Sequence, residues 1–131
     1  MKKQNLLRNQ EGFTLVEIIA VLIILGILAA VAVPRYIDLE KSAKIRAVDA
    51  AVAELNGRES LVWADVKISG TGYSDDNSVW NYPFSTDMGA DYEWTTVPNQ
   101  TTKGVLKFKG VEFTISRTAS TNNKPGVWTR Q

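Results

Sequence analysis

The residue types that most often carry chemistry are scarce in this 131-residue chain. It contains no cysteine and no histidine, which removes thiolate chemistry, disulfides and the usual metal ligand and proton shuttle at neutral pH. Its Asp and Glu residues are scattered without the convergent spacing that catalysis needs. Glu17 differs from the others because it is the single ionisable residue between Phe13 and Val33. An unpaired carboxylate inside an apolar helix is costly, so Glu17 demands protonation or a cationic partner.

The segment around Glu17 reads FTLVEIIAVLIILGILAAVAV and is long enough to cross a membrane. As a helix rising ~1.5 Å per residue it spans about 30 Å, which matches the hydrocarbon core of a bilayer. Its large apolar residues favour insertion by roughly 4–8 kcal/mol, against at most about 2.5–3.5 kcal/mol for an acidic group at the centre. Lys2, Lys3 and Arg8 precede it, so the positive-inside rule predicts that the N-terminus stays inside and the C-terminal part crosses.

Three interpretations of this apolar segment compete. A secretory signal cleaved after Ala30-Val31-Ala32 is one, although the segment is longer than the usual apolar region of a signal and carries a carboxylate. An ordinary membrane anchor, in which Glu17 has no role, is the second. The third depends on residues 12 to 17, Gly-Phe-Thr-Leu-Val-Glu, where a basic leader ends in glycine, a bulky apolar residue follows, and a carboxylate lies four residues later.

This third pattern resembles the class III leader of type IV prepilins and type II secretion pseudopilins, and the resemblance extends to Pro34. It implies cleavage between Gly12 and Phe13 by a prepilin peptidase, a membrane aspartic protease, and N-methylation of the new Phe13 terminus. It also implies a homo-oligomeric helical filament that a pilus or secretion machinery assembles. The precursor would lie in the inner membrane, N-terminus in and C-terminus out, and the filament would be periplasmic or extracellular.

Cleavage after Gly12 would create a cationic partner for Glu17. The α-ammonium of Phe13 and the Glu17 side chain are an i, i+4 pair on one face of a helix. In a stack of helices, the amine of an incoming subunit could instead meet Glu17 of its neighbour. Glu17 is therefore expected to set the register of assembly and to have no catalytic role.

Gly26 and Pro34 bracket the second half of the apolar helix. A proline inside a helix removes one backbone hydrogen bond and clashes with the carbonyl four residues earlier, here that of Ala30. The sequence therefore predicts a bend between Ala30 and Pro34. The resemblance implies that this stretch loosens during assembly, and a simple kink without function is the alternative.

Beyond Pro34 the pattern becomes amphipathic. One helical face collects the apolar residues Ile45, Val48, Val52, Leu55 and Val62. We expect one helix from about Phe13 to about Ala64, with an earlier end at Asn56-Gly57 as the alternative. The expected division is a cleaved leader at 1–12, a membrane and polymerisation helix at 13–34, an amphipathic continuation at 35–64 and a β-rich domain at 65–131.

The C-terminal part reads as a small antiparallel sheet. Residues 105–108 and 111–115 predict two strands joined at Lys109-Gly110, and residues 92–97 predict a third. Val111, Phe113 and Ile115 alternate with polar residues, which indicates one face on a core and one in water. The expected fold class is α+β, with a long N-terminal helix packed on a three- or four-stranded sheet. That is also the fold the resemblance implies.

Asp75, Asp76 and Asn77 are weak candidates for calcium binding, because they offer hard oxygen ligands. They lack EF-hand spacing, and Asx-turn chemistry explains the cluster equally well. No metal and no other cofactor is therefore expected.

The expected function is structural. The subunit would serve in a surface pilus for adhesion, motility or DNA uptake, or in a type II secretion pseudopilus, and the sequence leaves that choice open. A single-pass membrane-anchored periplasmic binding domain or enzyme is the alternative. A net charge of +1 gives no support for direct binding of nucleic acid, whose only expected link is indirect, through uptake.

Overall fold

A computed structural model of the chain describes residues 12–82, 85–100 and 102–131. The expected leader therefore lies outside the described residues, apart from Gly12. The chain divides into an N-terminal unit that ends at Leu39 and a globular unit, Glu40–Gln131. The four-part division expected from the sequence stays a prediction.

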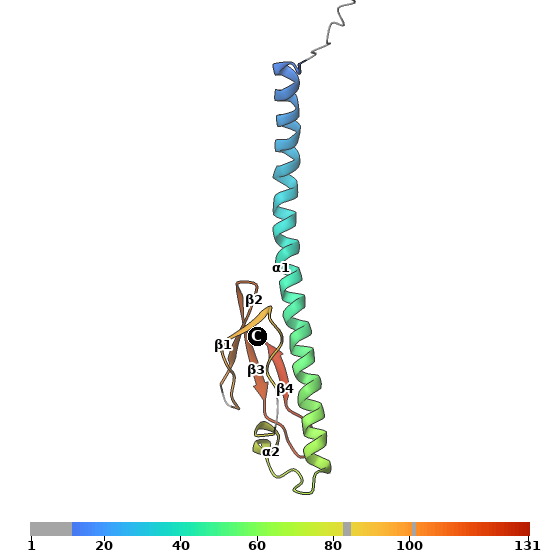
Figure 1. Cartoon of the computed structure of the whole chain (residues 1–131), viewed down its shortest axis with the longest axis vertical. Helices are drawn as coiled ribbons and strands as arrows, with labels where there is room; N and C mark the ends of the chain where they lie inside the picture. The colour runs from blue at the N-terminus through green and yellow to red at the C-terminus, as the bar shows by residue number, and fades with distance from the viewer. Residues whose placement is uncertain (1–11, 83–84, 101) are drawn as a thin grey trace, which may run out of the picture. The chain divides into compact units, whose positions relative to one another are not determined.

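Helix α1 (Leu15–Ile68) begins in the N-terminal unit and ends in the globular unit (Figure 1). Its first half is long and apolar enough to cross a membrane. The side chains of Leu22, Ile23, Ile24 and Leu25 are each more than half exposed, so none of the residues that the structure describes covers them. The expected apolar N-terminal helix is confirmed.

Helix α1 runs through Gly57 and past Ala64, so the earlier end at Asn56-Gly57 was wrong. Glycine inside a helix is unfavourable by about 1 kcal/mol. Contacts of the residues on both sides of Gly57 outweigh that cost. Asn56 is hydrogen-bonded to the backbone of Trp128, and Glu59 accepts a hydrogen bond from Arg117. The helix ends where Ser69 Oγ donates to the carbonyl of Val66.

Four antiparallel strands form the sheet in the order β1-β2-β3-β4. They are β1 (Tyr92–Thr96), β2 (Gly104–Phe108), β3 (Val111–Thr118) and β4 (Val127–Arg130). The expected turn between β2 and β3 is confirmed. Lys109 and Gly110 both have positive φ, 44° and 83°, which is the conformation of a two-residue hairpin turn matched to strand twist.

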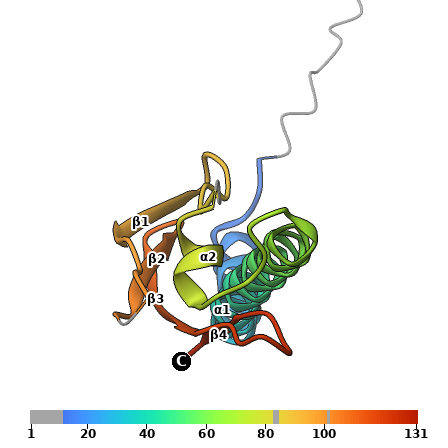
Figure 2. The same ribbon diagram turned by 90° about the horizontal axis from the view of Figure 1, so that it is seen from below.

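Two elements of the globular unit were not predicted. One is β4, which supplies the fourth strand, and the other is the short helix α2 (Asp76–Trp80), which includes two of the three calcium candidates. Figure 2 places β4 next to α1 and β1 farthest from it. The order of the strands thus puts the C-terminal segment against the helix.

The core lies between α1 and the sheet. It consists of Val48, Ala51, Val52, Leu55, Leu106, Ile115 and Trp128. The predicted apolar stripe of α1 therefore faces the sheet, with Ile45 and Val62 half-buried at its ends. On β3 the predicted alternation holds for Phe113 and Ile115, while Val111 beside the turn is 39% exposed.

Leu55→Ala should remove a fully buried side chain and leave a cavity in this core. We expect the free energy of unfolding to fall by ~2–5 kcal/mol, equivalent to a drop in Tm of roughly 10–20 °C for a unit of this size. Leu61→Ala is the matched control, because Leu61 is 73% exposed. Thermal unfolding of the full chain in detergent micelles, followed by tryptophan fluorescence, makes the comparison. Equal Tm values for the two variants would contradict this core assignment.

Candidate functional site

Glu17 lies in the first turn of α1 and closes a capping box with Thr14. The backbone N–H of Thr14 donates to Glu17 Oε2 at 2.7 Å, and the N–H of Glu17 donates to Thr14 Oγ1 at 3.2 Å. Two backbone donors that a helix start leaves unpaired are satisfied in this way. The Thr14 partner was not predicted, although the pattern Thr-x-x-Glu before an apolar run is its sequence signal.

Phe13, Glu17, Ile18, Ala20 and Val21 line one apolar surface pocket of about 520 Å³ at the start of α1. Phe13 is 84% exposed and immediately precedes the capping residue. Phe13, which precedes the helix, and Glu17 therefore line the same pocket, and their pairing in assembly stays a prediction. A carboxylate here lies among aliphatic side chains, where a cationic partner has most effect.

The structure gives no packing reason for glycine at positions 12 and 26 or for proline at position 34. A Cβ built at Gly12 or Gly26 would meet nothing within 4 Å. Pro34 lies inside α1, and the helix continues on both sides of it. The bend and its role in assembly stay predictions.

The three calcium candidates are engaged in other contacts. Asp75 is the N-cap of α2, accepting from the N–H of Ser78 at 3.3 Å, as Asx-turn chemistry requires. Asn77 accepts from Gln100 Nε2 at 2.9 Å. Asp76 pairs with a buried guanidinium, which would repel a cation. Within the described ranges no group of three or more acidic side chains could hold a metal ion, and we propose no metal site.

A buried charged triad of Arg117, Glu59 and Asp76 joins three elements of the globular unit and was not predicted. Arg117 on β3 donates to Glu59 on α1 from Nε at 3.1 Å and from Nη2 at 2.5 Å. It also donates to both oxygens of Asp76, the first residue of α2, at 2.8 Å. The Arg117 side chain is fully buried, and Glu59 is 1% exposed.

The remaining polar atoms of the triad are also paired. Trp128 Nε1 donates to Glu59 Oε2 at 3.1 Å, and the N–H and hydroxyl of Ser120 both donate to Asp76 Oδ1 at 2.6 Å. In the part of the chain that the structure describes, every buried side-chain nitrogen and oxygen has a partner. Packing is so close that a Cβ at Gly126 would lie 2.6 Å from Glu59 Oε1. A buried ion group is tolerable only with such complete pairing.

The contacts of the triad shift the pKa values of Asp76 and Arg117. Burial alone would raise the pKa of Asp76, but hydrogen bonds from Arg117 and Ser120 and the charge of Arg117 outweigh it and lower the pKa to about 2. Burial alone would lower the pKa of Arg117, but the two carboxylates raise it above its ordinary value. Asp76 and Arg117 are therefore both charged at every physiological pH, which suits a structural tie rather than proton transfer.

Two sequence signals could have revealed the triad. Glu59 continues the buried positions of α1, following Val52 and Leu55 at helical spacing. Arg117 continues the core-facing alternation of β3 after Phe113 and Ile115. Opposite charges at two core positions predict a buried pair, whereas only the structure places Asp76 with them.

Known proteins match the chain both at its start and along its length. The family model of the prokaryotic N-terminal methylation motif matches residues 7–33. The type IV narrow pilus major component of Thermus thermophilus is 36% identical over 111 residues, which cover 85% of this chain and 90% of that protein. The type IV major pilin protein of Neisseria gonorrhoeae is 32% identical over 130 residues, 93% of this chain but 53% of that protein.

A third relative matches a shorter stretch. The type II secretion system core protein G of Pseudomonas aeruginosa is 53% identical over 38 residues, 29% of this chain and 27% of that protein. No solved structure matches the chain significantly.

The lowered pKa of Asp76 predicts a loss of stability in acid. Its contribution is fully present above the ordinary value of 3.8 and disappears as the pH falls through about 2. We expect the loss to be about 2 kcal/mol. Asp76→Asn should be less stable than the natural chain at pH 7 and should lack this part of the acid dependence.

Chemical unfolding of the full chain between pH 5 and pH 2 measures this dependence. Asp75→Asn is the matched control, because asparagine caps a helix as well as aspartate does. It should keep the natural pH profile. An Asp76→Asn profile as steep as the natural one would contradict the assignment.

Proposed function

Because the chain belongs to the type IV pilin family, we propose that it is a body subunit of a surface pilus that polymerises through the apolar part of α1. The observation that carries this proposal is the exposed apolar helix with a single carboxylate, Glu17, at its start. The Thermus relative, of which the chain covers 90%, is the major component of a narrow pilus. The secretion relative matches over only 38 residues, so it supports a pseudopilus role less.

Maturation is part of the proposal. A prepilin peptidase cleaves between Gly12 and Phe13, and the new terminus is methylated. Among the described residues, a Cβ at Gly12 would meet nothing within 4 Å apart from its own neighbours in the chain. A need for glycine at this position would therefore come from outside the chain, as it would in a protease subsite with no room for a Cβ.

The precursor inserts with its basic leader inside and its globular unit outside. Lys2, Lys3 and Arg8 favour this orientation. The assembly machinery then transfers α1 from lipid to a bundle of identical helices. Both surroundings cover the apolar side chains that the chain leaves exposed.

Glu17 fixes the register of that bundle. The ammonium of Phe13 in an incoming subunit pairs with Glu17 of its neighbour, in an apolar environment where the attraction is weakly screened. Aliphatic contacts between helices supply most of the attraction but distinguish poorly between one register and the next. A charge that must meet its opposite selects one of them.

Fibres sheared from the surface of cells that make this chain should contain it with Phe13 as a methylated first residue. Electron microscopy shows the fibres, and mass spectrometry of their N-terminal peptide identifies the terminus. Gly12→Val should leave the leader attached and abolish the fibres, with the precursor still in the membrane. A fibre subunit that keeps its leader, or that begins after Ala32, would refute the proposal.

Glu17→Gln separates the register role of Glu17 from its capping role. Glutamine can still accept the Thr14 hydrogen bond in a capping box, but it carries no charge. We expect membrane insertion to be unchanged and fibre yield to fall at least tenfold. Thr14→Val is the matched control, since it removes the capping hydroxyl and keeps the carboxylate; its fibre yield should stay near that of the natural chain. Normal yield with Glu17→Gln would show that the charge is dispensable.

A further inference from the structure

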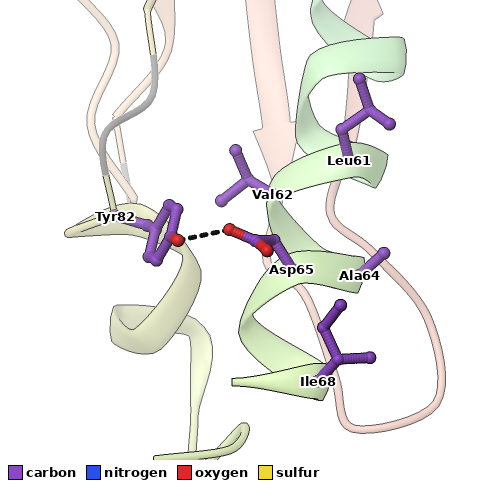
Figure 3. Close-up of a pocket in the computed structure, with 6 residues that line it drawn as sticks. All are labelled: Leu61, Val62, Ala64, Asp65, Ile68 and Tyr82. Carbon is purple, nitrogen blue, oxygen red and sulfur yellow. Dashed lines mark hydrogen bonds between the residues drawn. The ribbon is translucent and has the colours of Figure 1, made fainter. Parts of the chain in front are cut away.

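The last two turns of α1 carry an apolar groove on the surface of the globular unit (Figure 3). The groove has a volume of about 460 Å³ and is lined by Leu61, Val62, Ala64, Asp65, Ile68 and Tyr82. Leu61 is 73% exposed and Ile68 is 84% exposed, so no described part of the chain covers these two large side chains. Apolar side chains gathered in one groove in this way mark an interaction surface more often than singly scattered ones do.

Asp65 gives the groove a charge as well as an apolar lining. Its carboxylate lies among the apolar side chains and accepts a hydrogen bond from the hydroxyl of Tyr82 (Figure 3). Among the described residues no ion pair includes Asp65. The groove therefore fits an apolar group that carries a cation beside it.

The turn between β2 and β3 offers that combination. Lys109 projects from the turn with its side chain 59% exposed, and Val111 beside it is 39% exposed. The Lys109 ammonium lies 4.0 Å from Asp91, which is 67% exposed, and 5.8 Å from the centre of the Phe108 ring. Contacts this loose in water contribute little and leave the ammonium free to turn to another partner.

The turn and the groove lie at opposite ends of the globular unit. Val111 pairs with Phe108 and Phe108 with Tyr92, whose hydroxyl donates to the carbonyl of Ala47. The groove begins at Leu61, farther along α1 by roughly 20 Å at 1.5 Å per residue. In Figure 1 the arrow of β3 accordingly runs from the turn toward α2 and the end of α1. A chain cannot place its own turn in its own groove.

We propose that the groove receives the β2–β3 turn of a second copy of this chain, with Lys109 pairing with Asp65 and Val111 packing on Leu61 and Ile68. This contact rests on the filament role proposed above, because it needs copies aligned in the same direction. The two surfaces differ, so the contact is heterologous, and its repetition gives an open filament rather than a closed dimer.

A cysteine pair tests the contact directly, because the chain has no cysteine of its own. Fibres of the Ile68→Cys, Val111→Cys double variant should give a ladder of dimers, trimers and higher species on mild oxidation. Each single variant, and the control pair Lys124→Cys with Val111→Cys, should stay monomeric. A ladder supports the heterologous contact. Monomers only, or dimers only, in well-formed fibres of the double variant would overturn it.

Charge exchange tests the ion pair. Lys109→Asp and Asp65→Lys should each lower fibre yield about threefold or more, and the double exchange should restore at least half of the natural yield. Lys124→Asp is the matched control, an equal change of charge on an exposed lysine, and should keep the natural yield.

Failure of this contact and failure of the filament role give different results. Normal fibres from both single exchange variants, or no recovery in the double exchange, would overturn the contact and leave the filament role intact. Absence of fibres from the natural chain would overturn both.

Discussion

Helix α1 carries more apolar surface than this chain can cover, and the rest of the structure depends on that constraint. In the globular unit the helix buries Val48, Val52 and Leu55 against the sheet. In the N-terminal unit the equivalent side chains are exposed all around the helix. Apolar surface in water is unfavourable by about 25 cal/mol per Å², so a free monomer in water is strongly disfavoured. In the assembly proposed above, lipid covers the N-terminal unit before assembly and neighbouring helices cover it afterwards. Outside the membrane, the polymer is thus the state that leaves the least apolar surface in water.

The globular unit has to hold its C-terminal strand against α1 without a disulfide. Three contacts do this along the helix: Asp49 with Arg130, Asn56 with the backbone of Trp128, and Glu59 with the indole N–H of Trp128. Replacing a buried ion group by apolar residues is often neutral, whereas removing one partner costs about 3–5 kcal/mol. The triad therefore adds less to stability than to specificity, because only one arrangement of α1, α2 and β3 satisfies all its charges.

The predictions from sequence succeeded where periodicity extends over many residues. The apolar helix, the amphipathic stripe and the hairpin at Lys109-Gly110 each repeat a signal several times, and packing agreed with it. They failed for β4 and α2, which are held in place by partners distant in the chain, Asn56 for β4 and Arg117 for α2. The triad escaped prediction for the same reason, since Asp76 is 41 residues from Arg117 in the chain. The capping partner of Glu17 was local, and the Thr-x-x-Glu signal identifies it.

The roles of Gly12, Phe13 and Glu17 in assembly concern other molecules, so no single-chain structure tests them.

The two contacts proposed between subunits differ in the medium that surrounds them, and this difference gives them different tasks. Glu17 and the Phe13 ammonium would meet among aliphatic side chains, where water and salt hardly screen their attraction. Lys109 and Asp65 would meet at the surface, where the screening length shrinks from about 8 Å at physiological ionic strength to about 3 Å in 1 M salt. Added salt should therefore loosen the contacts between globular units while the helix register persists. Such a filament could loosen the contacts between its globular units and still keep its bundle of helices. The pair that fixes the register of the bundle, Glu17 and the Phe13 ammonium, would lie where water does not reach it.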